Sequence, residues 1–145
     1  MMPASIARRL AVGALTVLIV ALPGRAARAQ SLTVLPIAVQ MVPGQMTSIL
    51  RIINQGDSET TIQIRTFAWS QPEGKDQLTT SDEVLASPPL ATVPRGGTQI
   101  VRLVLRRRPL GREATYRILL DQIPPPAAPG TVRIALRLSI PIFAQ

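Results

Sequence analysis

The most regular alternation of apolar and polar positions lies near the end of the chain. Between residues 131 and 143 every second position is aliphatic, namely Val132, Ile134, Leu136, Leu138, Ile140 and Ile142. Because successive side chains of a β-strand point to opposite faces, the pattern predicts one strand over residues 131–143 with an apolar stripe on one face. Arg133 and Arg137 fall between these positions and are expected on the opposite, solvated face. Such a stripe must be covered, because an exposed apolar strand promotes aggregation.

The preceding part of the chain, from residue 30 onward, reads as short apolar runs separated by turn residues. Strands are expected over residues 32–39, 46–53, 60–69, 84–86, 98–105 and 115–123. Pro36 interrupts the first run, which is typical of an edge strand or of a strand that changes sheets. Together with the final strand, the spacing predicts an all-β, immunoglobulin-like seven-stranded β-sandwich in a single domain.

Proline and one tyrosine refine this interpretation. The segments at residues 70–81, 106–113 and 124–130 are expected to be loops, the first polar, the second basic and the third rich in proline. Ser87-Pro88-Pro89 is a candidate for a cis peptide bond, and the sequence leaves cis and trans open. Tyr116, near the start of the sixth predicted strand, is a candidate tyrosine corner.

The first part of the chain has a different character. Arg8 and Arg9 precede an apolar run over residues 10–22, and Ala27-Arg28-Ala29 follows it. This order is typical of a secretory signal peptide over residues 1–29, with a mature start at Gln30 and export to the periplasm by a Sec-type route. A run of about 13 apolar residues is too short to span a bilayer, so we expect no stable membrane insertion after cleavage.

Composition limits the possible functions. The chain has no cysteine and no histidine, which excludes thiol catalysis, histidine acid–base chemistry and the usual zinc sites. The acidic pairs Asp57/Glu59 and Asp82/Glu83 lie in predicted turns without a partner base, so solubility explains them better than catalysis. No phosphate-binding loop is present, so no cofactor is expected. Residues 30–145 carry 12 basic and 8 acidic residues, scattered and with few aromatics, and no nucleic-acid partner is expected.

Five stretches, in the same order, resemble segments of the N-terminal domain of PapD-like periplasmic pilus chaperones. They are L-R-I-I-N-Q-G at residues 50–56, A-S-P-P at 86–89, P-R-G-G followed by I-V-R-L within 94–103, Y-R-I-L-L-D-Q-I-P at 116–124 and L-S-I-P-I-F at 138–143. The amino-acid sequence of residues 63–71 and 139–143 is most similar to the archaic, spore-coat-U-associated branch of that family. The resemblance covers nearly all of residues 30–145.

This resemblance implies a function without catalysis. Members of the family bind and cap pilus, fimbrial or spore-coat-U-like subunits by donor-strand complementation, and they deliver them to an outer-membrane usher. In this mode the chaperone lends its last strand to a subunit whose own fold lacks one. By resemblance, the donated side chains are Val132, Ile134, Leu136 and Leu138, whereas Ile140 and Ile142 pack in the chaperone's own core.

The family also anchors the carboxylate at the subunit's C-terminus with two basic residues, which align near Ala38 and Pro141 in this chain. Neither position is basic here. A guanidinium still suits a carboxylate, because its planar fork donates two charge-assisted hydrogen bonds. Arg117, on the predicted sixth strand, is the first candidate for this role, and Arg102 is the second.

Family members usually carry a second sandwich domain after the last strand. Residues 30–145 correspond to the first domain, and the second is expected to be absent, through a truncated gene, a fragment or a single-domain relative. The alternative to a chaperone is a truncated or stand-alone immunoglobulin-like structural module without a client. That alternative predicts that Ile134, Leu136 and Leu138 are buried inside the domain.

Overall fold

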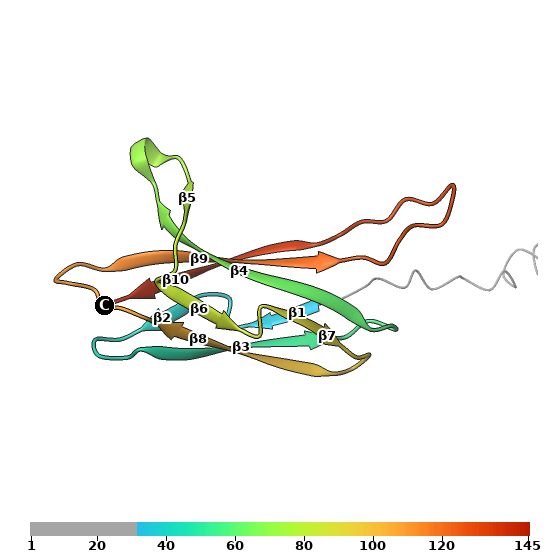
Figure 1. Ribbon diagram of the computed structural model, residues 1–145, viewed down its shortest axis with the longest axis horizontal. Helices are drawn as coiled ribbons and strands as arrows, with labels where there is room; N and C mark the ends of the chain where they lie inside the picture. Colours follow the sequence, from blue (N-terminus) through green and yellow to red (C-terminus); the bar gives the residue numbers. More distant parts are fainter. Residues whose placement is uncertain (1–31) are drawn as a thin grey trace, which may run out of the picture.

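A computed structural model describes residues 32–145 of the chain (Figure 1). The predicted signal peptide and the expected start at Gln30 lie outside these residues. Within residues 32–145, no helix has the length and hydropathy needed to cross a membrane.

The described residues form two facing β-sheets, which confirms the all-β, immunoglobulin-like fold class. The first sheet has the order β1 (Leu32–Leu35), β3 (Thr47–Asn54), β8 (Thr98–Leu105) and β6 (Val84–Ser87). The second has the order β2 (Val39–Met41), β10 (Arg137–Ala144), β9 (Ala114–Ile123), β4 (Thr60–Ser70) and β5 (Gln77–Thr80), and β7 (Leu90–Val93) also pairs with β4. A short 3-10 turn, Pro72–Gly74, joins β4 to β5, and this hairpin projects from the body of the sandwich (Figure 1).

The first predicted strand divides at Pro36 and changes sheets. β1 pairs with β3 in the first sheet, whereas β2 pairs with β10 in the second, and that β2–β10 pair is parallel. The Leu35–Pro36 peptide bond between the two strands is cis. The interpretation of Pro36 as a point where the chain changes sheets is therefore confirmed, and the Ser87–Pro88 bond is also cis.

An aliphatic core fills the space between the sheets. β3 and β8 contribute alternate residues from one side, and β4, β9 and β10 contribute from the other, including Leu50, Ile52, Val101, Leu103, Ile62, Ile64, Ile118, Leu120, Ile140 and Ile142. The Phe and Trp side chains lie elsewhere, half-buried on the outer face of the second sheet. The alternation read from the sequence therefore places the core correctly along these strands.

The final strand is shorter than predicted. β10 begins at Arg137, and residues 131–136 are not part of any strand. The reason lies on the partner strand, because β9 ends at Ile123 and the prolines at 124–126 have no N–H with which to continue the ladder. The connection from β9 to β10 consequently extends beyond the end of the sandwich (Figure 1).

The expected tyrosine corner at Tyr116 is wrong. Its hydroxyl donates a hydrogen bond of 2.8 Å to the Glu83 carboxylate, and not to a main-chain carbonyl nearby in the sequence. Burial, as the main cause, and the hydrogen bond to the Glu83 carboxylate together raise the pKa of Tyr116 to about 12. From the sequence, Glu83 was expected only to contribute to solubility in a turn. Its contact with Tyr116 instead links β9 to the start of β6.

Asn54 joins two turns at one end of the first sheet. Its side chain is fully buried, and its amide group donates to the carbonyls of Ser58 at 2.7 Å and Val93 at 3.1 Å. Its carbonyl oxygen accepts a hydrogen bond of 2.9 Å from the Gly56 main-chain N–H. One side chain thus satisfies main-chain groups of two separate segments, as buried polar groups require.

Candidate functional site

β10 is only partly covered along the side that faces away from β9. On the β9 side its ladder runs from the Arg137–Asp121 pair to the Ala144–Ala114 pair. On the other side β2 pairs only with Ile142–Ala144. Over residues 137–141 no strand of the described chain pairs with this side, so it presents main-chain groups to a partner. An uncovered edge of this kind readily accepts another strand.

The apolar row of the final segment passes from the core into solvent. Ile142 and Ile140 are buried, and Leu138 packs against the core. Beyond the start of β10, the exposed fraction rises from 37% at Leu136 to 81% at Ile134 and 92% at Val132. The molecule therefore holds one half of the row as its own core and exposes the other half. Of the three residues that the structural-module alternative expects to be buried, Leu138 packs against the core, whereas Leu136 and Ile134 do not lie inside the domain.

Arg117 lies next to this edge on the outer face of the second sheet. It is the register partner of Pro141 on β10, which the sequence resemblance aligns with one of the two basic anchor positions. The guanidinium carbon lies 3.9 Å from the centre of the Trp69 ring, and one nitrogen is 3.3 Å from the Ser139 hydroxyl. Stacking on an aromatic ring holds the guanidinium in place.

The Trp69 ring is itself held by two neighbours. It meets the Phe143 ring edge-to-face, with the ring centres 6.1 Å apart. Its indole N–H donates a hydrogen bond of 3.0 Å to the Asp76 carboxylate. This bond, followed by one from Gln71, lowers the pKa of Asp76. Asp76 also lies 3.8 Å from a nitrogen of Arg117, so the arginine already has one weak acidic neighbour.

The structure does not bring the second anchor candidate to this edge. Arg102 is an exposed residue of β8 in the other sheet, where its register partners are Ile49 on β3 and Ser87 on β6. Arg117 and the segment at residues 131–138 belong to the second sheet and its connection. Of the two candidates, only Arg117 lies in the sheet that contains β10.

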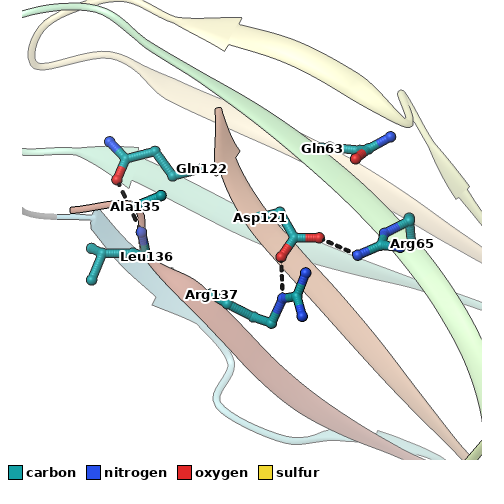
Figure 2. Close-up of a pocket in the computed structure, with 7 residues that line it drawn as sticks. All are labelled: Gln63, Arg65, Asp121, Gln122, Ala135, Leu136 and Arg137. Atoms are coloured by element: carbon teal, nitrogen blue, oxygen red, sulfur yellow. Dashed lines mark hydrogen bonds and ion pairs between the residues drawn. The ribbon is translucent and has the colours of Figure 1, made fainter. Parts of the chain in front are cut away.

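A charged cluster that sequence analysis missed lies where β10 begins (Figure 2). The Asp121 carboxylate accepts hydrogen bonds from Arg137 on β10 and from Arg65 on β4, the latter at 2.5 Å. The bond from Arg137, followed by the one from Arg65, lowers the pKa of Asp121. These residues line an open hollow of about 430 Å³ together with Gln63, Gln122, Ala135 and Leu136. All three charged residues lie at outward-facing positions of neighbouring strands. This signal predicts the cluster only when the order β4–β9–β10 is already known.

Within residues 32–145 the structure shows no group of three or more histidine, cysteine, aspartate or glutamate side chains arranged to hold a metal ion.

Comparison with known protein families identifies the family of this chain. Residues 31–145 match the family of pili and flagellar-assembly chaperones, PapD N-terminal domain. The chain belongs to this family. The resemblance noted from the sequence is thereby confirmed, and the family consists of chaperones, not enzymes. It includes periplasmic chaperones such as SfaE.

Solved structures of pilus chaperones share the fold. A chaperone of the archaic Csu pili of Acinetobacter baumannii, solved as the CsuC–CsuE complex with a tip adhesion subunit, is similar at 30% identity with a TM-score of 0.70. That match covers 79% of this chain and 51% of the other. The class 5 fimbriae chaperone CfaA is 16% identical with a TM-score of 0.68, over 79% of this chain and 56% of CfaA.

A third structure contains the Salmonella enterica SafA pilin in complex with the SafB chaperone. It is 17% identical to this chain with a TM-score of 0.64, over 81% of this chain and 55% of the other. The chain thus spans about half the length of the pilus chaperones that it matches. No curated protein sequence matched it.

Proposed function

We propose that this pilus-chaperone domain captures pilus or spore-coat-U-type subunits in the periplasm and caps them until they reach an outer-membrane usher. The observation that carries the proposal is the apolar row that is core at Ile142 and exposed at Ile134 and Val132, beside an uncovered strand edge. Crystallised relatives in complex with an adhesion subunit and with a pilin support the same class of partner. The proposed export to the periplasm rests on the signal peptide expected over residues 1–29.

Capture proceeds by extension of β10. Residues 131–136 become extended, and Val132, Ile134, Leu136 and Leu138 then continue the row already begun by Ile140, since alternate residues of a strand share a face. Main-chain groups along residues 137–141 pair with the subunit, and the row enters its apolar groove. Burial of the exposed side chains and the new main-chain hydrogen bonds supply the free energy, so neither ATP nor a cofactor takes part.

Arg117 is proposed as the group that binds the subunit's terminal carboxylate. Its position beside Pro141 and its stacked, pre-oriented guanidinium favour this role. Within residues 32–145, the acidic contact that competes for it is a weak one of 3.8 Å to Asp76. Arg102 is less suited to the role, because it lies on the outer face of the other sheet.

The test is co-expression in a periplasm with the subunit genes encoded beside this chain, followed by purification and native mass measurement. The wild-type chain is expected to form a one-to-one complex with a pilin-like subunit. Ile134→Asp should abolish the complex, because a carboxylate cannot enter an apolar groove without a partner. Leu110→Asp is the matched control, because Leu110 is also large and apolar and is 95% exposed, but it lies in the β8–β9 loop. Capture that survives Ile134→Asp would refute donation by this row.

A further inference from the structure

Two neighbouring residues of β9 hold the beginning of β10, one from each face of the sheet. On the outer face, the Asp121 carboxylate binds Arg137, the first residue of β10, and is fixed to β4 through Arg65 at 2.5 Å (Figure 2). The Asp121 side chain is only 15% exposed, whereas Arg137 is 63% exposed, so the contact is open to water on the arginine side. Arg137 is therefore bound to β9 directly and linked to β4 through Asp121.

On the inner face, Gln122 holds Leu136, the residue before Arg137. The Gln122 main-chain N–H donates to the Leu136 carbonyl at 2.9 Å. Its side-chain oxygen accepts from the Leu136 N–H at 3.4 Å, as Figure 2 shows. The Gln122 amide group donates in turn to the Thr60 hydroxyl of β4 at 2.9 Å, in a buried position. Asp121 and Gln122, together called the clasp, thus fasten residues 136 and 137 to β9 and β4.

The clasp coincides with the boundary between paired strand and exposed segment. The β9–β10 ladder ends with the Arg137–Asp121 pair, and three residues further out Ile134 is already 81% exposed. Because the side-chain period of a strand is two, a one-residue change in pairing register turns every following side chain to the opposite face. With a fixed departure point, extension of residues 131–136 brings Ile134 and Val132 into line with Ile140.

We propose that Asp121 and Gln122 are positioning residues for subunit capture. They fix the residue at which β10 leaves the sandwich, and so the register in which residues 131–136 are offered to a subunit. This inference rests on the proposed function. Holding the departure point in advance reduces the ordering that capture itself requires, which is the general advantage of a preorganised binding segment.

The central variant is Asp121→Asn, which keeps the shape of the side chain and removes its charge. Its matched control is Asp82→Asn, which breaks another carboxylate–arginine contact, with Arg106 at 2.5 Å, at an exposed site. The probe is the pilin-like subunit that co-purifies with the wild-type chain. We expect Asp121→Asn to release this subunit about tenfold faster, equivalent to about 1.4 kcal/mol, whereas Asp82→Asn should not change the rate. Asp121→Glu should restore part of the loss.

A second measurement reports register directly, which a loss of stability alone would not alter. The chain has no cysteine, so Arg133→Cys and Ile134→Cys can each supply a single thiol on it. With the clasp intact, complexes should leave the thiol at position 133 reactive toward a labelling reagent and protect the one at position 134. Addition of Asp121→Asn should reduce this contrast.

The outcomes separate the two claims. If Asp121→Asn and Asp82→Asn give the same release rate and the same contrast between positions 133 and 134, the positioning role is wrong and the chaperone function stands. A lower melting temperature with unchanged contrast assigns Asp121 to stability alone and also overturns the inference. If the wild-type chain captures no subunit, the proposed function fails and the positioning role fails with it.

Discussion

Two isoleucines of the same row should respond to the same truncation in opposite ways. Ile142 is fully buried between the sheets, so Ile142→Ala removes core contacts and leaves a cavity. Substitutions of this kind lower the free energy of unfolding by about 2–5 kcal/mol. Ile134 is 81% exposed in the free chain, and Ile134→Ala should change the free energy of unfolding by no more than about 0.5 kcal/mol.

Subunit capture should show the reverse dependence. If Ile134 enters the groove of a subunit, its truncation removes most of the free energy gained by burying one aliphatic side chain, about 2 kcal/mol. The affinity for the subunit should then fall about 30-fold. At a temperature where both variants are folded, Ile142→Ala should retain affinity within a few-fold, because its side chain stays in the chaperone core.

Urea unfolding of the free chain and competition for a subunit against labelled wild-type chain measure the two quantities separately. Equal destabilisation of the free chain by both variants would show that residues 131–136 belong to the core. Unchanged affinity of Ile134→Ala would show that the exposed half of the row is not donated. Either result would refute the division of the row into a core half and a donated half.

Three further predictions concern single side chains. The pKa of Tyr116 is raised to about 12 in the folded chain, against about 10 in the unfolded chain. The stability that this shift contributes is therefore complete below pH 10 and is lost as the pH rises toward 12. Since the chain has one tyrosine, its tyrosinate absorbance should titrate near pH 12, and Tyr116→Phe should flatten the alkaline fall in melting temperature. Asn54→Ala should lower the free energy of unfolding by about 3 kcal/mol in urea titrations, because buried main-chain groups lose their partners; a change below about 1 kcal/mol would contradict this. Arg117→Ala should weaken subunit capture at least about tenfold through loss of a charge-assisted pair, whereas Arg102→Ala should leave it unchanged, and equal effects would argue against Arg117 as the anchor.

The sequence was most informative where a strand is central and half-buried. The predicted run at residues 98–105 has the bounds of β8. The run at 46–53 is displaced from β3 by one residue at both ends, and the run at 115–123 begins one residue after β9. In these strands the apolar alternation and the turn residues agree, so local pattern and tertiary packing indicate the same structure. β5 and β7 were missed because both are short strands that pair with β4 alone. β5 lies within a segment expected to be a loop, and no element was assigned to the residues of β7.

The final strand shows what alternation does not establish. Alternation at residues 131–136 predicts which residues would share a face of a strand, but a strand also needs a partner for its main-chain groups. The prolines after Ile123 remove that partner on the β9 side. In the free chain residues 131–136 are exposed and lie outside any strand, so their shared face stays a prediction for the bound segment. The contacts of Asp121 could not be predicted from the sequence for a related reason, because they depend on the order of β4, β9 and β10 in the sheet.

The placement of the aromatic rings has a spectroscopic consequence. The chain's single tryptophan, Trp69, lies on the outer face of the second sheet, beneath the Arg117 guanidinium and against Phe143 of β10. Its emission is therefore sensitive to the neighbourhood of the β10 edge even while the aliphatic core is unchanged. A ligand that draws Arg117 away from the indole should alter the quantum yield, so the protein carries an intrinsic fluorophore that reports occupancy of its own edge.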